Sequence, residues 1–235
     1  MSEAILSPIL NDLGIAFDAA LQAKFHRYFE LLAEWNQKMN LTAIVDEEGV
    51  YEKHFLDSIL PAKTISFEGK SVLDIGSGAG FPGLVIALLY PSSKVTVLDA
   101  TAKKFVFLKT VCEELGLTNV SFVNGRIEES PVARESFDVT ISRGFAALGI
   151  FLECAAPFTK VGGVVLAMKG VSYQEEMDEA LPLVKKLGLR YAKTDLQNLP
   201  SAGMRANVLY DKVAFTPKKF PRRWDEMKRG SVHHG

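Results

Sequence analysis

The sequence predicts an α/β fold in which a doubly wound, mostly parallel sheet carries helices on both faces. From residue 71 onward, short apolar runs alternate with helical patterns, as in parallel sheets that are covered on both sides. The runs lie at 71–75, 94–98, 120–123, 137–141 and 163–168. A glycine-rich segment at 74–83 follows the first run, at the turn from strand to helix.

Two amphipathic helices are expected before the sheet. Residues 18–39 carry apolar side chains at a 3.6-residue period, and Asp18 is placed as the N-cap. A second helix is expected over 47–60, ending before Pro61 because proline lacks the N–H that a helix needs. These helices predict an N-terminal helical cap over residues 1–66.

The C-terminal third predicts the end of the sheet and a tail. A helix is expected over 173–187, and two strand-like segments, 190–196 and 206–215, are joined by a turn-rich stretch. Such a close pair predicts a hairpin that adds one antiparallel strand, which completes a seven-stranded sheet. We therefore expect the main domain at 67–215 and a basic arm at 216–235.

Composition and charge narrow the class of protein. The chain of 235 residues is 48% hydrophobic, and no stretch is apolar enough to span a membrane, so we expect a cytoplasmic monomer. Cys112 and Cys154 lie in apolar periodic segments and match no metal-ligand spacing, which indicates core thiols. We expect no metal site, and the adjacent His233 and His234 do not make one.

The net charge of −1 is unevenly distributed. From Lys212 onward, seven basic residues stand against two acids, which leaves +5 in the tail and −6 in the remainder. A basic arm on an acidic body is a candidate contact for the phosphates of a nucleic acid, and a solvated tail is the alternative.

The glycine loop predicts a nucleoside-type cofactor. Glycines such as Gly76 and Gly78 let a ligand approach the backbone at a helix N-terminus. The spacing also fits dinucleotides, but the Asp74 carboxylate would repel a pyrophosphate and attract the ammonium group of S-adenosylmethionine. Asp99, about 20 residues beyond the loop, is placed to accept hydrogen bonds from ribose hydroxyls, and the 125–128 loop to hold adenine.

Two sequence features that are missing restrict which kind of atom could be methylated. The fourth strand is followed by Ser142-Arg143-Gly144-Phe145, not by the Asn-Pro-Pro-Tyr type of segment typical of enzymes that methylate exocyclic amines. Neither cysteine is placed as the nucleophile that methylation of pyrimidine C5 requires. Ring nitrogens or oxygens remain the better targets.

Further motifs make the chain similar to the RsmG (GidB) family. They are Trp35-Asn36, Asn40-Leu41-Thr42, His54-Phe55-Leu56-Asp57-Ser58, Phe81-Pro82-Gly83, Ser142-Arg143, Lys169-Gly170 and the segment from Thr216 to Arg223. That family methylates N7 of one guanine in bacterial 16S ribosomal RNA, and the likeness covers essentially the whole chain. It differs at the end, where Trp224-Asp225-Glu226-Met227 replaces the usual Gly-x-Pro-x-Lys.

The resemblance implies a class I, Rossmann-like methyltransferase that uses S-adenosylmethionine. It implies cofactor contacts at Gly76, Phe81, Ile127, Glu128 and Arg143, with Asp99 on the ribose, beside the loop residues Asp74 and Gly78. Substrate contacts, to 16S rRNA or the small ribosomal subunit, are expected at Lys169, Lys218, Lys219, Arg222 and Arg223.

The expected target atom requires no catalytic residue. Guanine N7 has an in-plane lone pair and no proton, so the enzyme mainly has to align two reactants. Two other interpretations remain open from sequence: a nicotinamide-dependent oxidoreductase, and a non-catalytic RNA-binding or assembly factor that retains a cofactor fold.

Overall fold

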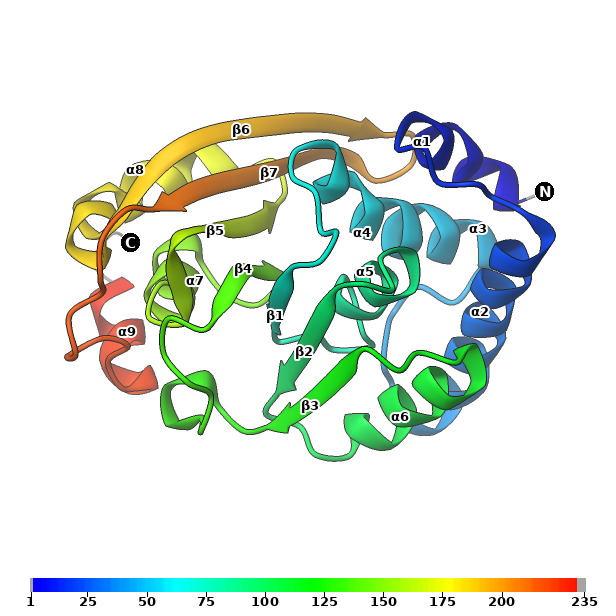
Figure 1. Ribbon diagram of the computed structural model, residues 1–235, viewed down its shortest axis with the longest axis horizontal. Helices are drawn as coiled ribbons and strands as arrows, with labels where there is room; N and C mark the ends of the chain where they lie inside the picture. The colour runs from blue at the N-terminus through cyan, green and yellow to red at the C-terminus, as the bar shows by residue number, and fades with distance from the viewer. Residues whose placement is uncertain (1, 232–235) are drawn as a thin grey trace.

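The computed structural model describes residues 2–231 and contains one seven-stranded sheet (Figure 1). The strand order is β3-β2-β1-β4-β5-β7-β6, and neighbouring strands among β1 to β5 pair in parallel. Their bounds are β1 Ser71–Ile75, β2 Lys94–Asp99, β3 Val120–Asn124, β4 Phe137–Arg143 and β5 Thr159–Lys169. The doubly wound, mostly parallel sheet is therefore confirmed. His233 and His234 lie outside the described residues.

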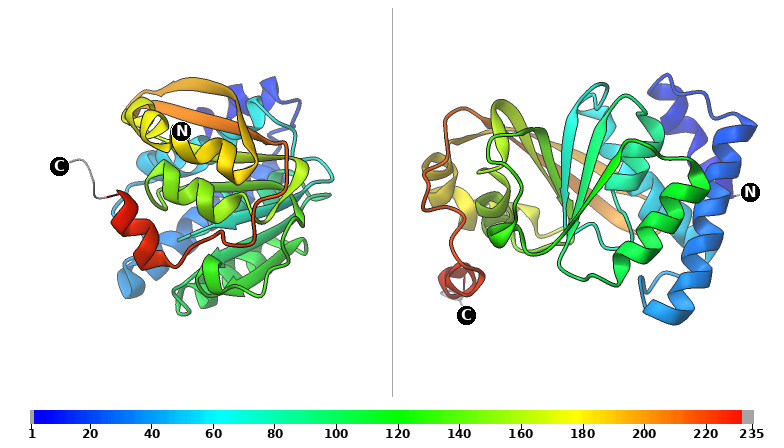
Figure 2. Two further views of the ribbon diagram at one scale, coloured as in Figure 1. Left: turned by 90° about the vertical axis from the view of Figure 1, so that its left-hand side faces the viewer. Right: turned by 60° about the horizontal axis from the view of Figure 1, so that its bottom comes forward.

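Helices cover both faces of the sheet, because successive side chains of a strand point to opposite sides. Val72 packs in a core with the N-terminal helices, α5 and α6, whereas Leu73 packs in a second core with α7, α8 and α9. Figure 2 shows these two layers from the side. The helices run over α5 Gly83–Leu89, α6 Lys104–Leu115, α7 Leu148–Ala155, α8 Tyr173–Val184 and α9 Trp224–Ser231.

The N-terminal cap begins with a 3₁₀ turn at Ser2–Ile5, α1 at Ser7–Asp12, and α2 at Ala19–Met39. The predicted N-cap of α2 is confirmed, because an Asp18 carboxylate oxygen accepts a hydrogen bond from the Leu21 N–H at 2.8 Å. Tyr28 of α2 donates from its hydroxyl to the Ala79 carbonyl in the glycine loop at 2.7 Å. The cap and the sheet share one hydrophobic core, and the division at residue 66 stays a prediction.

The second predicted helix is present, and its α-helical part ends before Pro61 as expected, but a 3₁₀ turn continues the helical run to Lys63. It runs as α3 Glu47–Val50, a π-helical segment Tyr51–Leu56, α4 Asp57–Ile59 and a 3₁₀ turn Leu60–Lys63. Pro61 is tolerated because it occupies the second position of the 3₁₀ turn, where a backbone N–H is not needed. Single π-helical turns are frequent at functional sites, and this one carries Lys53 and His54.

The terminal hairpin is present, with β6 at Leu189–Leu199, longer than predicted, and β7 at Gly203–Lys212, of the predicted length but three residues earlier. β7 is antiparallel to both neighbours, and a register shift between Tyr191 and Lys193 marks a bulge in β6. The turn between β6 and β7 is hydrogen-bonded to the cap: the Ser201 N–H donates to Glu52 Oε1 at 2.6 Å, and the Ser201 hydroxyl donates to the other carboxylate oxygen. The Glu52 side chain is buried, yet these hydrogen bonds lower its pKa overall.

Both cysteines are buried and free, as expected of core thiols. Burial raises the pKa of Cys112 to about 12 and that of Cys154 well above its usual value. None of the helices within residues 2–231 combines the length and apolar character that a membrane-spanning segment needs.

Lys212, the first basic residue of the sequence-defined tail, is part of the core. Its side chain is fully buried at the end of β7, and its Nζ donates to the two carboxylate oxygens of Glu135 at 2.7 and 2.9 Å. Burial lowers the pKa of Lys212, and the hydrogen bonds to Glu135 oppose that effect. The pair joins the last strand to the segment before β4.

We predict that Glu135→Gln lowers the free energy of unfolding by about 3–5 kcal/mol, the usual cost of leaving a buried charge without its partner. Asp211→Asn is a matched control, because Asp211 precedes Lys212 in β7 but pairs with Arg190 at the exposed surface. It should cost less than about 1 kcal/mol. Urea denaturation followed by circular dichroism measures both, and equal costs would show that the Lys212 pair is no more important than a surface pair.

Candidate cofactor and substrate pockets

The glycine loop between β1 and α5 is held from below by Asp74. This side chain is fully buried, and its Oδ2 accepts hydrogen bonds from the Ser77 hydroxyl at 2.7 Å and the Gly83 N–H at 2.8 Å. Burial raises the pKa of Asp74 to about 6. Within residues 2–231 its Oδ1 has no hydrogen-bond partner. The structure thus places Asp74 beneath the loop and not among the residues that line the pocket beside it.

Gly76 begins the loop in a backbone conformation that favours glycine, with φ at +75°. A Cβ at this position would lie 2.7 Å from Cδ2 of the Phe145 ring, so the absence of a side chain lets the β4–α7 loop approach. The Gly78 N–H donates to Asp99 Oδ2 at 3.0 Å, and Gly78 does not line the pocket described below. The loop is therefore bonded to the ends of both β1 and β2.

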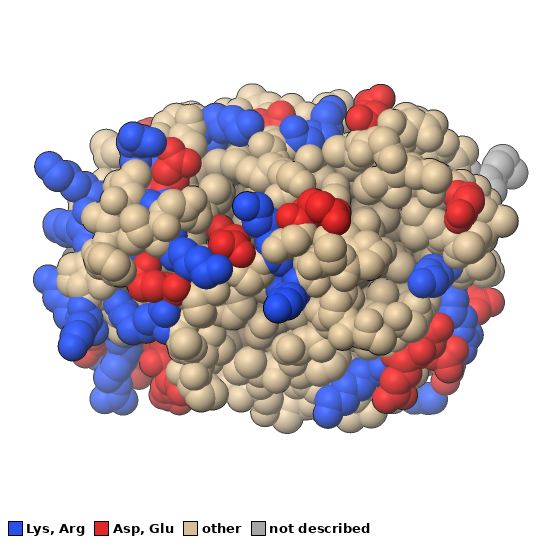
Figure 3. Space-filling model, in the orientation of Figure 1, with Lys and Arg blue, Asp and Glu red and all other residues tan. Residues whose placement is uncertain are grey.

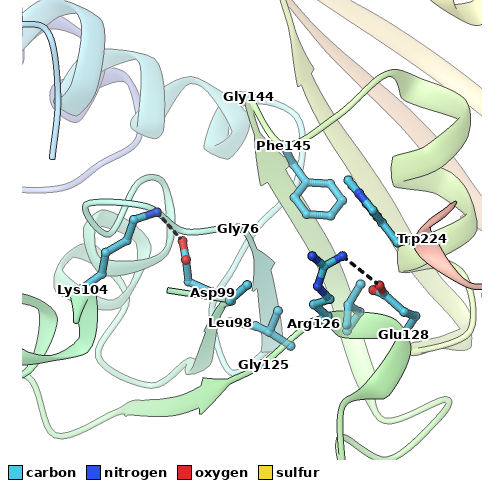
Figure 4. A pocket seen from close by; sticks show the side chains of 12 residues that line it. Gly76, Leu98, Asp99, Lys104, Gly125, Arg126, Glu128, Gly144, Phe145 and Trp224 are labelled. Atoms are coloured by element: carbon cyan, nitrogen blue, oxygen red, sulfur yellow. Dashed lines mark hydrogen bonds and ion pairs between the residues drawn. The ribbon is translucent and has the colours of Figure 1, made fainter. Parts of the chain in front are cut away.

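A pocket of about 310 Å³ opens beside this loop, at the carboxyl ends of β1, β2 and β4 (Figure 4). This size is within the range of roughly 300–1,000 Å³ that is typical of small-molecule sites. Four of the sequence-predicted cofactor residues come together there: Gly76, Asp99, Ile127 and Glu128. We call this cavity the first pocket.

Asp99 lies on one side of the first pocket, where Lys104 donates to its Oδ2 at 2.9 Å and the Thr101 N–H donates to its Oδ1 at 2.8 Å. The other side is formed by the loop after β3, where Arg126 and Glu128 are paired at 3.8 Å (Figure 4). Carboxylates therefore stand on both sides of the first pocket, each next to a cation.

Two aromatic rings in the first pocket were not predicted as site residues. Phe145 follows β4 and Trp224 begins α9, and their ring centroids are 5.6 Å apart at an interplanar angle of 62°. Figure 4 shows both rings at one side of the cavity. Phe145 lies just after a strand end, which is a usual position for site residues. Trp224 gave no such signal, because its position depends on how the tail returns to the sheet.

A second pocket of about 380 Å³ lies next to the first and shares Gly144 with it. Its polar lining combines cations and carboxylates from the cap, the strand ends and the hairpin. These residues are Lys53, His54, Asp57, Arg143, Lys169, Glu176 and Arg205. Of the predicted cofactor residues, Arg143 faces this second pocket and does not line the first.

Arg143 ties the end of β4 to the π-helical segment of the cap. Its guanidinium donates to the Lys53 carbonyl at 2.7 Å and to Asp57 Oδ2 at 3.1 Å, and lies 3.0 Å from His54 Nδ1. It also lies 5.3 Å from the centre of the Phe81 ring, a cation–π distance. Phe81 is buried beneath it and lines neither pocket.

His54 is held as a neutral imidazole. Burial, together with the charge of Arg143, lowers the pKa of His54 to about 3. Since Arg143 can only donate, Nδ1 of His54 must accept, and Nε2 then donates to the Thr42 hydroxyl at 2.8 Å. His54 and Asp57, which share a helix face, are thus joined through Arg143. Burial raises the pKa of Asp57, and the positive charges of Arg143 and Arg205 oppose this rise.

The predicted substrate residues divide into two groups. Lys218, Lys219 and Arg223 are exposed, whereas Lys169 lines the second pocket and donates to Glu176 at 2.7 Å. Arg222 does not belong to a free arm, because it pairs with Glu153, which is 1% exposed. Lysine and arginine gather at the left end of the face in Figure 3, where Figure 1 places α8, α9 and the C-terminus.

No group of three or more histidine, cysteine or acidic side chains within residues 2–231 is arranged to hold a metal ion. The candidate site consists of two adjacent pockets, one beside the glycine loop and one between the cap and the strand ends.

Solved structures of low sequence identity share this fold. A TYW2 structure from M. jannaschii, determined in complex with AdoMet, aligns with a TM-score of 0.55 and 17% identity over 72% of this chain and 77% of that one. A SAM-dependent methyltransferase from Aquifex aeolicus aligns with a TM-score of 0.52 and 18% identity over 75% and 97%. These likenesses support the class I, Rossmann-like fold.

Sequence comparisons identify the family. Residues 21–197 match the family model described as rRNA small subunit methyltransferase G (GidB). A protein of Brevibacillus brevis with the name ribosomal RNA small subunit methyltransferase G is 41% identical over 95% of this chain and 96% of its own length. One of the same name from Staphylococcus epidermidis is 42% identical over 95% of both. The chain belongs to the ribosomal RNA small subunit methyltransferase G family.

Proposed function

We propose that this protein transfers a methyl group from S-adenosylmethionine to N7 of a guanine in bacterial 16S ribosomal RNA. The observation that carries the proposal is the contact between the two pockets at Gly144. A methyl donor in the first pocket and a target nucleotide in the second would meet there. Family membership supports the substrate class, and an rRNA substrate implies action in the cytoplasm.

The first pocket suits the cofactor in three respects. Asp99 offers carboxylate oxygens at the end of β2, where ribose hydroxyls are bound in folds of this type. Gly76 leaves room at the loop, and the 125–128 loop with Ile127 and Glu128 forms the opposite wall for adenine. Asp74 does not line the first pocket, but its buried carboxylate lies below the loop, and its negative charge attracts a cationic ammonium group at the loop.

The second pocket suits a nucleotide that has left its base stack. Lys53, Arg143 and Arg205 provide positive charge for phosphates, and Asp57 and Glu176 are hydrogen-bond acceptors for the N–H groups of guanine. The cation–carboxylate pairs keep these side chains in fixed positions before the substrate arrives.

The cofactor supplies an electrophilic methyl group on a sulfonium, and this chain's residues provide alignment. N7 carries no proton, so no side chain has to remove one. His54 is neutral and its two nitrogens are already bonded, which fits a positioning role: it keeps the Arg143 guanidinium in place at the second pocket.

We predict that Gly76→Ala lowers the affinity for S-adenosylmethionine at least tenfold, because the new methyl group would enter the space between the loop and Phe145. Gly116→Ala is the matched control. Gly116 has a similar φ of +66° at the end of α6, and nothing lies within 4 Å of the added Cβ. Both changes carry the strain of alanine at positive φ, about 1–2 kcal/mol. Titration calorimetry on the folded variants measures both affinities for S-adenosylmethionine. If both equalled that of the wild type, the assignment of Gly76 to the cofactor site would be wrong.

We predict that the single-turnover rate of methyl transfer, with RNA and cofactor saturating, is nearly constant from about pH 6 to 9. No base has to ionise, and His54, with a pKa of about 3, stays neutral over that range. His54→Ala should lower the rate without changing the shape of the profile, because it loosens Arg143. A rate that rises tenfold per pH unit in the wild type, and not in His54→Ala, would show a general base and a different target atom.

We predict that replacing Lys218, Lys219 and Arg223 by alanine weakens RNA binding and lowers the salt dependence. About 0.7 counterions are released per neutralised phosphate of a single strand, so the slope of log K against log salt should fall in magnitude by about 2. Lys24→Ala with Lys38→Ala, on the exposed face of α2, is the control and should change it little. An unchanged slope in the triple variant would mean that the tail does not contact RNA phosphates.

A further inference from the structure

The start of α9 lies in the first pocket, although the sequence assigns it to a basic arm. Trp224 lines the cavity with Phe145, and it lies on the side opposite Asp99 and Lys104 (Figure 4). Its indole is half-buried, so part of the ring surface is open. An apolar ring surface left open in a pocket is available to a flat, apolar ligand group.

Anchors on both sides of Trp224 fix its position. Arg222 precedes it and grips the buried carboxylate of Glu153 on α7, with the backbone N–H and Nε donating to Oε1 at 2.8 Å and the terminal nitrogen donating to Oε2 at 2.7 Å. Met227 follows it, is 1% exposed, and places its sulfur 3.9 Å from Cys154 Sγ. Trp224 is thus held between two contacts to buried residues, Glu153 before it and Cys154 after it, and forms a wall of the pocket.

The chain leading to these anchors is also attached to the body. Arg134 donates to the Phe220 carbonyl at 2.6 Å and to the Thr216 carbonyl at 2.9 Å, and Phe220 is buried in the same core as Met227. Lys218 and Lys219, between these points, face solvent. The segment from 216 to 227 therefore has an inner side that completes the first pocket and an outer side that carries positive charge.

We propose that Trp224 binds the adenine of S-adenosylmethionine as an aromatic wall of the first pocket, so that docking of α9 and cofactor binding are thermodynamically coupled. The inference rests on the proposed function, which supplies the ligand. The ring stands on the same side of the cavity as Glu128, next to the loop that faces Asp99 (Figure 4). Adenine between that loop and Trp224 leaves its ribose directed toward Asp99.

The first experiment measures affinity for S-adenosylhomocysteine by titration calorimetry. Trp224→Ala should lower the affinity about tenfold, within the range seen when a base-stacking aromatic is removed, and Trp224→Phe should restore most of it. Phe215→Ala is the matched control, because Phe215 is an aromatic residue directly before that segment, is 76% exposed and lines neither pocket. It should bind as the wild type does.

The second experiment uses the fact that the chain has only two tryptophans. Trp35 lies in α2 of the cap and packs against Phe107 of α6, on the other face of the sheet. In Trp35→Phe the emission of Trp224 should change saturably with S-adenosylhomocysteine, at the midpoint found by calorimetry, whereas Trp224→Phe should show no change. Arg222→Ala tests the coupling between α9 docking and cofactor binding, because it leaves the Trp224 ring intact but should lower the affinity for S-adenosylhomocysteine. The same coupling predicts that trypsin cleaves the tail more slowly when S-adenosylhomocysteine is bound.

The outcomes separate this inference from the proposed function. A folded wild-type protein that does not bind S-adenosylhomocysteine or S-adenosylmethionine would contradict the proposed function itself. Wild-type binding with equal affinity in Trp224→Ala would overturn only the role of Trp224. Tighter binding in Trp224→Ala would also overturn it, by showing that the indole competes for the space of the ligand.

Discussion

The buried carboxylate of Asp74 is the constraint on which the glycine loop and the first pocket depend. One oxygen joins three parts of the chain: the end of β1, the middle of the glycine loop through Ser77, and the start of α5 through Gly83. A Cβ at Gly83 would lie 2.7 Å from that same oxygen, so the bond also requires glycine there. With the loop fixed in this way, Gly76 can face Phe145 and Gly78 can reach Asp99. A carboxylate beneath a loop thus determines the shape of a pocket that it does not line.

A comparable role at the second pocket belongs to Arg143. The guanidinium holds the cap and the end of β4 together through one carbonyl, one carboxylate and one imidazole, all within 3.1 Å. Its charge is a main reason, after burial, why His54 is neutral. The second pocket is therefore built from elements that lie far apart in the sequence, and it depends on the docking of the cap.

The sequence allowed the fold to be predicted wherever local rules decide. Asp18 as an N-cap and the five parallel strands follow from spacing and from apolar runs, and the glycine loop predicts the edge of the sheet at which the first pocket opens. Long-range partners were not accessible in the same way. Neither the pairing of Arg222 with Glu153, 69 residues away, nor the position of Trp224 has a local signature, so the whole tail was interpreted as an outward arm. Periodicity also could not show that Arg143 faces the second pocket, since both pockets begin at the same strand ends.

The bond between Glu52 and Ser201 has a consequence for the order in which the protein is completed. The two residues are 149 positions apart, and the carboxylate is buried only because the hairpin turn supplies its donors. An unpaired carboxylate resists leaving water, so the packing of the cap around Glu52 depends on the turn between β6 and β7. The first helices of the chain thus reach their final arrangement only together with its last two strands.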